Sequence, residues 1–73
     1  MMRDSLPSNP VLTPREREVL DLIIAAQSDR EIAASMRITE HTVRFHLANL
    51  FQKFGVCSRT QLTVACFRQK LAA

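Results

Sequence analysis

The residues of this chain best suited to chemistry lie between positions 40 and 54, where polar and apolar side chains recur with a helical period. One face of the predicted helix carries His41, Arg44, Phe45 and Ala48. An arginine on such a face can donate two hydrogen bonds to guanine O6 and N7. An exposed phenylalanine is costly unless something covers it, and a thymine methyl group is a suitable partner. This pattern predicts a helix that contacts base edges in double-stranded DNA.

Each of these side chains also has an interpretation that needs no DNA. Arg44 would then be a solvated surface arginine, and Phe45 would pack against the first helix or a neighbouring chain. Ala48 would simply favour the helix, although its small side chain would equally let the backbone approach a base. The residues alone leave both interpretations open.

Two helices joined by three residues are predicted to position this face. Ser28 and Glu31 form a capping box, which begins a helix over residues 29 to about 36. Thr39 can cap a second helix over residues 40–54 with its hydroxyl group. This arrangement is that of a helix-turn-helix, whose second helix enters the major groove of DNA.

The buried face and the ends of the second helix follow from its spacing. Its apolar positions recur at steps of four, three and four: Val43, Leu47, Leu50 and Phe54. Gly55 is the expected stop, because glycine takes a left-handed backbone without strain. The turn before the helix usually carries glycine where this chain has Arg37. A left-handed Arg37 would cost about 1 kcal/mol, and an alternative turn geometry would also accommodate it.

Two further helices complete the predicted fold. A capping box at Thr13 and Glu16 begins a helix that continues to about Ala26. Ser58 begins a last helix over residues 59 to about 69. No stretch alternates like a strand, so the predicted class is all-α, a four-helix bundle that contains the helix-turn-helix.

Size and charge agree with one small domain that prefers an anionic partner. The chain has 73 residues, 10 Lys and Arg against 7 Asp and Glu, and a net charge of +3. No acidic residue lies from position 43 onward, so the basic half begins on the predicted recognition helix. Residues 1–11 hold two prolines and read as a lead-in or linker remnant, which leaves residues 12–73 for the domain.

The sequence does not favour an enzyme or a metal protein. It has no Gly-rich phosphate loop and no Cys–His arrangement with fixed spacing, so we expect no catalysis and no cofactor. His41 and His46 are five residues apart, which is the wrong spacing for a helical metal pair. Two scattered thiols, Cys57 and Cys66, make no disulfide framework and suit a reducing cytoplasm. We expect no membrane contact, because no apolar run is long enough.

Four ordered motifs resemble the LuxR-type (GerE-like) DNA-binding domain of bacterial transcription regulators. They are L-T-P-R-E-R-E-V-L at 12–20, S-D-R-E-I-A at 28–33, I-T-E-H-T-V-R-F-H at 38–46, and K-F-G-V with S-R-T-Q at 53–61. The resemblance covers roughly residues 12–71. It implies a four-helix domain that binds DNA as a dimer. The length resembles that of small GerE-like regulators without a sensor domain, or equally an excised C-terminal module.

The resemblance also implies roles for individual residues. Arg44, Phe45 and Ala48 match positions that approach base edges. Four residues match phosphate contacts or their supports: Arg30, Thr42, His46 and Lys53. Members of the family act on DNA in the cytoplasm and nucleoid, and an activator would also meet RNA polymerase, although no residue here identifies that surface.

The last helix of the family commonly forms the dimer contact. In this chain the candidates for that interface are Val64, Phe67 and Leu71. Such a homodimer would place two recognition helices on a roughly palindromic site. The chain departs from the family pattern at the end of the first helix, where Ala26 stands near a frequent glycine, and at Lys70, where the last helix often ends in glycine.

Two questions remain open on the sequence alone. A helical protein-interaction module that no longer reads DNA is the alternative function, because Phe45 and the last helix present apolar groups. Arg59 begins the last helix, where a cation is unfavourable, so we expect it to pair with a carboxylate such as Glu16, Glu18 or Glu31.

Overall fold

The computed structural model describes residues 11–72, with side chains described as far as residue 68. Over that range it contains four helices and no strand: α1 (Pro14–Ile24), α2 (Asp29–Met36), α3 (Glu40–Phe54) and α4 (Arg59–Ala72). The predicted all-α class is therefore confirmed. Most of the expected lead-in, residues 1–10, lies outside the described part of the chain.

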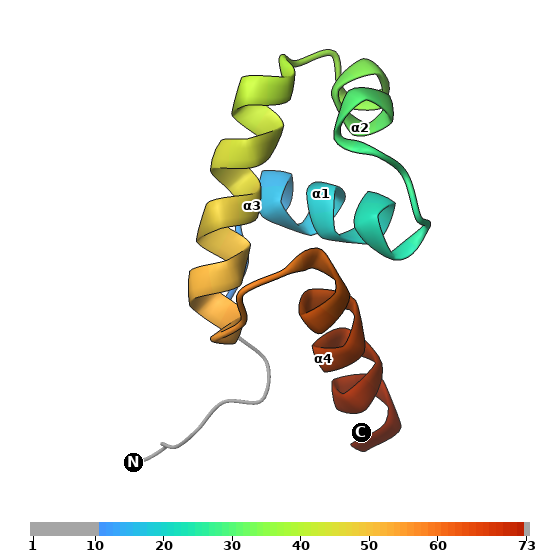
Figure 1. Ribbon diagram of the computed structural model, residues 1–73, viewed down its shortest axis with the longest axis vertical. Coiled ribbons are helices and arrows are strands. Elements are labelled where there is room, and N and C mark those ends of the chain that lie inside the picture. The colour runs from blue at the N-terminus through green and yellow to red at the C-terminus, as the bar shows by residue number, and fades with distance from the viewer. Residues whose placement is uncertain (1–10, 73) are drawn as a thin grey trace.

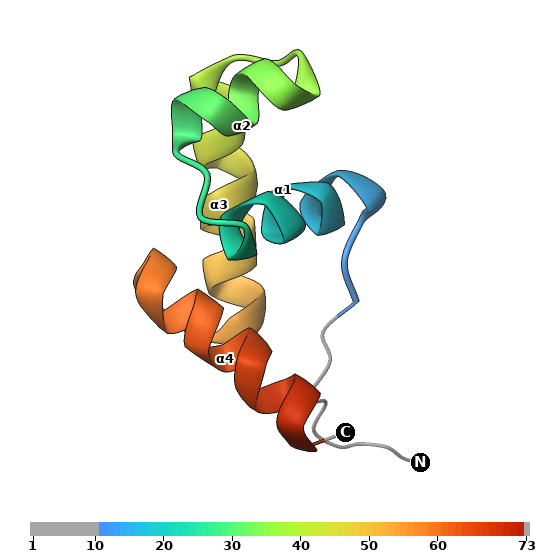
Figure 2. The ribbon, with the colours of Figure 1, turned by 90° about the vertical axis from the view of Figure 1, so that its right-hand side faces the viewer.

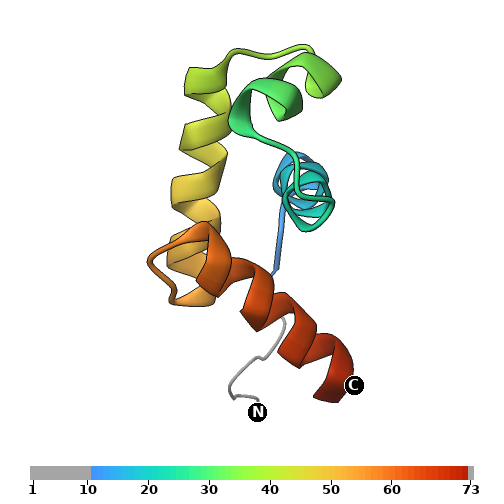
Figure 3. The ribbon, with the colours of Figure 1, turned by 45° about the vertical axis from the view of Figure 1, so that its right-hand side comes forward.

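Helix α3 is the axis of the molecule, and the other three helices pack against it. Figure 1 shows α3 upright, with α1 crossing beside it, α2 near its N-terminal end and α4 near its C-terminal end. Turning the molecule in Figures 2 and 3 shows α4 running obliquely at the end of α3 opposite α2. This order leaves one long face of α3 without a covering helix.

The helix starts match the sequence signals. Thr13 and Glu16 form the predicted capping box of α1, with backbone-to-side-chain hydrogen bonds of 3.0 and 3.1 Å. Ser28 and Glu31 do the same for α2 at 2.8 and 3.2 Å. The Thr39 hydroxyl accepts the N–H of the third residue of α3 at 3.1 Å. Each cap satisfies donors that the first helical turn leaves unpaired.

The core lies where the inward faces of the four helices meet. Its buried apolar residues are Val19, Leu20, Ile23, Ile32, Ala33, Met36, Val43, Leu47, Leu50, Leu62 and Cys66. The predicted stripe of α3 is thus confirmed at three of its four positions as fully buried, and Phe54 is half-buried against the same cluster. Ile38 in the turn also packs on it, as expected from its apolar side chain.

Three helices end in the same left-handed turn, although only one of them has glycine there. The left-handed residues are Ala26 (φ 66°), Arg37 (φ 58°) and Gly55 (φ 67°). In each case the next residue donates its N–H to a carbonyl five positions earlier, at 3.0–3.1 Å. That pattern is a Schellman motif, and it satisfies carbonyls that the helix end leaves free.

The expected helix ends need two corrections. The first helix was expected to reach about Ala26 but ends at Ile24, because Ala26 adopts the left-handed conformation that closes the motif. The last helix was expected to reach about Gln69 and continues to Ala72. No glycine or proline follows position 69, so nothing in the sequence stops it there.

Candidate nucleic-acid interface

The uncovered face of α3 carries the four side chains predicted to contact bases. His41, Arg44, Phe45 and Ala48 are all exposed, whereas the opposite side of the helix is buried. The Arg44 side chain is 63% exposed and Phe45 is 61% exposed. A phenylalanine this accessible on the surface of a small domain leaves apolar area that a partner can cover.

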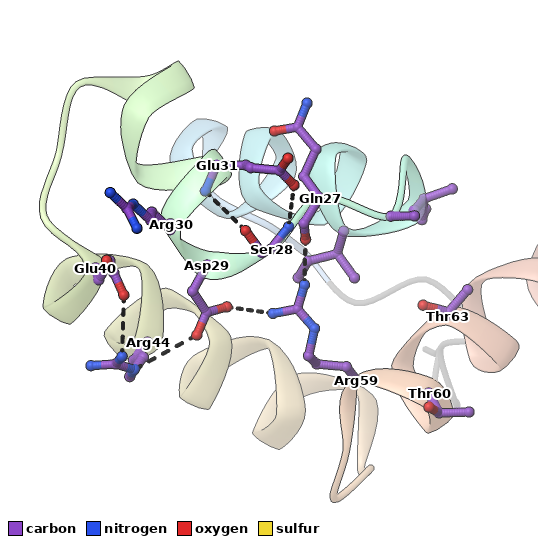
Figure 4. Close-up of a pocket in the computed structure, with 13 residues that line it drawn as sticks. Gln27, Ser28, Asp29, Arg30, Glu31, Glu40, Arg44, Arg59, Thr60 and Thr63 are labelled. Carbon is purple, nitrogen blue, oxygen red and sulfur yellow. Dashed lines mark hydrogen bonds and ion pairs between the residues drawn. The ribbon is translucent and has the colours of Figure 1, made fainter.

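Arg44 is held at one edge by two carboxylates. Its Nε lies 3.6 Å from Asp29 Oδ2 on α2, and its Nη2 lies 3.4 Å from Glu40 Oε1, one turn earlier on α3. Neither pair uses Nη1. Figure 4 shows the Arg44 guanidinium facing both acids, with a dashed line to each.

Asp29 is shared with a second arginine, Arg59 at the start of α4. Arg59 Nη1 donates to Asp29 Oδ1, and Nη2 donates to the Gln27 carbonyl at 2.6 Å. The expected pairing of Arg59 with a carboxylate is therefore confirmed, but none of the acids named as examples, Glu16, Glu18 and Glu31, is its partner. Glu16 is engaged by Lys53 and Glu31 by the cap of α2, while Glu18 pairs with Arg15 on α1.

Sequence reasoning placed Asp29 only at the start of a helix and assigned it no contact with the candidate interface. Asp29 and Arg44 are fifteen residues apart, and Asp29 and Arg59 are thirty apart. Such pairs follow no helical period, so no local pattern reveals them.

The residues proposed for phosphate contact lie in different environments. Arg30 is exposed on α2. The Thr42 hydroxyl lies 3.0 Å from the Thr39 hydroxyl, within the cap of α3. His46 is half-buried, and its ring lies edge-on to Phe45 with centroids 5.8 Å apart.

Lys53 supports the fold besides facing solvent. Its Nζ lies 2.5 Å from Glu16 Oε1 and 3.0 Å from the Val11 carbonyl. Glu16 is the buried charged residue of the described core and is only 4% exposed. The hydrogen bond from Lys53, with that from the Thr13 backbone, lowers the pKa of Glu16 below its usual value despite burial. Two of the three ammonium hydrogens of Lys53 are therefore engaged within the fold.

The candidate dimer residues lie on α4. Val64 is 42% exposed and Phe67 is 52% exposed, so both leave apolar surface uncovered. The side chain of Leu71 lies outside the described part of the structure. Within the described residues, no group of three or more His, Cys, Asp or Glu is placed to hold a metal ion. None of the described helices has both the length and the apolar character that crossing a membrane requires.

Comparison with known proteins identifies the family. The sequence profile of "Bacterial regulatory proteins, luxR family" matches residues 10–66, most of the chain. The chain belongs to this family. Its luxR-type domain is homologous to DNA-binding transcription regulators, which agrees with the helix-turn-helix formed by α2 and α3.

The relatives of the luxR-type chain include a short protein of similar length and longer proteins that it matches only in part. It is 43% identical over 68 residues to the spore germination protein GerE of Bacillus subtilis, covering 93% of this chain and 92% of that one. It is 42% identical over 65 residues to the probable transcriptional regulatory protein NarL of Mycobacterium tuberculosis, covering 89% of this chain and 30% of NarL. The chain thus matches nearly all of a short relative and less than a third of a longer one.

Solved structures show the same luxR-type fold. A structure of the transcription factor GerE matches with a TM-score of 0.72 and 39% identity, covering 81% of this chain and 88% of that one. The response regulator ChrA of a heme-sensing two-component system matches with a TM-score of 0.78 and 36% identity. That match covers 86% of this chain and 31% of ChrA.

Proposed function

We propose that this chain binds double-stranded DNA at a specific sequence, with α3 in the major groove, and thereby regulates transcription. The exposed face of α3 carries this proposal, because it presents a long donor and an aromatic ring on a helix whose other face is buried. A helix held in this way can enter the groove without losing its packing. The excess of positive charge after position 43 favours an anionic partner at this end of the chain.

Each residue of the α3 face then has a task. Arg44 donates two hydrogen bonds to guanine, and Phe45 covers a thymine methyl group. Ala48 lies one turn further along and lets the helix backbone come close to the bases. His41 lies one turn before Phe45, near the N-terminal end of α3 from which recognition helices contact base edges.

Phosphate contacts would fix the helix in the groove without choosing a sequence. We assign them to Arg30, Thr42, His46 and Lys53. Arg30 is fully available, whereas Lys53 keeps one N–H for a phosphate beside its contacts with Glu16 and Val11. Lys53 therefore serves both the fold and the interface.

A homodimer through α4 would bring two copies of this interface to one site. Val64 and Phe67 supply the exposed apolar surface for it, and Leu71 would extend the same helix face. The two recognition helices would then enter successive major grooves, about 34 Å apart, on a roughly palindromic sequence.

Selection from random duplexes tests the proposal. The chain is incubated with a pool of random double-stranded DNA at two salt concentrations, and the bound fraction is sequenced. We expect an enriched motif with two-fold symmetry and affinity that falls steeply with salt. Motif-free binding would contradict sequence-specific recognition by this chain. No binding at low salt would contradict the DNA function and favour a protein-interaction module.

A further inference from the structure

Three charged side chains from three helices, two arginines and one aspartate between them, form a row of ion pairs that ends at the exposed face of α3. Arg59 on α4 donates to Asp29 on α2, and Asp29 faces Arg44 on α3 through its other carboxylate oxygen. Figure 4 shows the three side chains in that order beside an open hollow between the helices. Helices α2 and α4 do not pack on each other in the described part of the chain, so the Arg59 side chain links them.

The guanidinium of Arg44 is engaged along one edge only. Nε and Nη2, which face Asp29 and Glu40, lie on the same edge of the planar group. The other edge, which includes Nη1, stays available for two parallel hydrogen bonds to one base. Carboxylates at the first edge therefore restrict the directions in which the second edge can point.

Asp29 is well placed to set that direction because it is itself fixed. Its side chain is 27% exposed, less than half the exposed fraction of the Arg44 side chain. Its Oδ1 accepts from Arg59, whose second donor is tied to the Gln27 backbone carbonyl at 2.6 Å. The more exposed Arg44 side chain thus meets an acid that Arg59 holds in place, and Arg59 is itself tied to the backbone of Gln27.

We infer that Asp29 is a positioning residue for sequence discrimination, which orients Arg44 toward its base and is held in place by Arg59. This inference rests on the proposed function, because it concerns how Arg44 meets DNA. An ion pair this exposed contributes little to stability in water. The electrostatic interaction between Asp29 and Arg44 becomes stronger when the DNA interface excludes water and lowers the local dielectric.

The Asp29→Asn variant separates the two contacts of Asp29, one with Arg59 and the other with Arg44. The amide oxygen can still accept from Arg59, but a neutral NH₂ group then faces the Arg44 cation. Glu31→Gln is the matched control, since it removes one negative charge from the same first turn of α2 while glutamine preserves the capping box. Both variants lose one negative charge near DNA, but only Asp29→Asn alters the contact with Arg44. A difference between the two variants therefore reports on that contact.

The readout is the specificity ratio, which is the affinity for the selected duplex divided by that for a scrambled duplex of equal composition. We expect both variants to bind the scrambled duplex slightly more tightly, because each removes a charge that repels phosphate. Of these two variants, Asp29→Asn alone should lower the specificity ratio, by about two- to fivefold. Glu40→Gln, which touches Arg44 but not Arg59, should lower it in the same direction.

A double variant shows whether the effect passes through Arg44. In an Arg44→Ala background, Asp29→Asn should leave the specificity ratio unchanged. A merely structural role for Asp29 would instead lower the melting temperature and change the ratio regardless of Arg44. Equal ratios for Asp29→Asn and Glu31→Gln, or an undiminished effect without Arg44, would overturn the inference.

NMR of the free protein tests the contact without DNA. The Nε–H signal of Arg44, assigned by its loss in Arg44→Lys, should shift in Asp29→Asn and stay unchanged in Glu31→Gln. An unchanged signal in Asp29→Asn would overturn the positioning role even if DNA binding is specific. If wild-type protein binds no duplex while the signal shifts as expected, the proposed function fails and the contact between Asp29 and Arg44 stands.

Discussion

Among single residues, Arg44 should account for most of the discrimination between DNA sequences. It is the long cationic side chain in the middle of the exposed α3 face, with one guanidinium edge still open. We expect Arg44→Ala to reduce the preference for the selected site by about 1–3 kcal/mol, since a bidentate contact with guanine is lost. Fluorescence anisotropy with selected and scrambled duplexes measures this difference.

The control for this variant removes an equal charge elsewhere. Arg15→Ala changes an exposed arginine on α1, which pairs with Glu18 and does not touch the α3 face. Arg15→Ala should weaken binding to both duplexes by the same factor, or should leave binding to both unchanged. A similar loss of preference in Arg15→Ala and Arg44→Ala would show that net charge, not a base contact, underlies the effect.

Lys53 should contribute to the stability of the folded domain as well as to DNA binding. Its ammonium group is the partner of the buried Glu16 carboxylate at 2.5 Å. Lys53→Met keeps the length of the side chain but leaves that carboxylate without its cation, which should cost about 1–3 kcal/mol of unfolding free energy. Urea denaturation measures the loss. Unchanged stability, with a weaker salt dependence of DNA binding, would instead indicate a phosphate contact alone.

Glu16 should make the fold sensitive to acid. Its pKa is lowered in the folded state by Lys53 and by the Thr13 backbone N–H. A lowered folded-state pKa means that this contribution is present above the unfolded value of 4.5 and disappears as the pH falls through the folded value. We expect Glu16→Gln to be less stable at neutral pH and to lose less stability below about pH 4.5.

Thermal unfolding at a series of pH values measures that dependence. Glu18→Gln is the matched control, because Glu18 is 56% exposed in an ion pair on the same helix. It should retain the acid sensitivity of the wild-type protein. An identical pH profile for Glu16→Gln and wild type would show that another group governs acid unfolding.

Among the helices, the helix-turn-helix was the part most readily predicted from sequence. The caps at Ser28 and Thr39, the periodic apolar stripe and Gly55 are local signals, and they located both ends of α2 and α3. The same period placed His41 and Arg44 on the exposed face. Contacts between helices gave no such signal, so the partner of Arg59 and the role of Asp29 came only from the structure.

The end of α1 shows why a local signal can also be absent. Ala26 has the same left-handed backbone as Gly55, with φ of 66° against 67°. The apolar stripe of the first helix predicted that it continues through this position, and alanine, which usually favours a helix, gave no signal against it. The Schellman hydrogen bonds impose the conformation, and alanine adopts it at a cost that glycine avoids.

Exchanging the residues of these two turns should therefore have opposite effects. We expect Ala26→Gly to stabilise the protein by about 0.5–1 kcal/mol, because left-handed strain is relieved. Gly55→Ala should destabilise it by about 1 kcal/mol from backbone strain alone, since an added Cβ would meet no atom within 4 Å. Chemical denaturation of both variants measures these changes.

Ala34→Gly is the control for Ala26→Gly. Ala34 is also exposed but lies inside α2 with a right-handed backbone, so glycine there should cost about 0.5–1 kcal/mol. Destabilisation of similar size by both alanine-to-glycine variants would show that the turn at Ala26 carries no strain.

At the scale of the whole molecule, the fold separates two exposed apolar surfaces. Phe45 lies on the uncovered face of α3, whereas Val64 and Phe67 lie on α4, which Figures 1 and 2 place at the end of α3 away from α2. A small domain gains little by exposing apolar groups at two separate places unless each has a partner. DNA for one surface and a second copy of the chain for the other would account for both.

This division predicts that mutation of the two exposed phenylalanines has different effects, one on dimerisation and the other on contact with DNA. Phe67→Ala should weaken the dimer, because an apolar anchor at its centre is lost, at a cost of about 2 kcal/mol. Sedimentation equilibrium measures dimerisation, and anisotropy compares a palindromic duplex with a single half-site. We expect Phe67→Ala to bind the palindrome about thirtyfold more weakly while its affinity for the half-site is unchanged.

Phe45→Ala is the matched control, since it removes the same side chain from the other surface. It should leave dimerisation intact and weaken binding to both duplexes. The free-energy loss should be about twice as large on the palindrome as on the half-site, because two copies each lose a contact with a thymine methyl group there. The reverse result, a monomer in Phe45→Ala and an intact dimer in Phe67→Ala, would place the subunit contact on α3. In that case α3 could not enter the major groove of DNA while the dimer persists, and α4 would have to face a different partner.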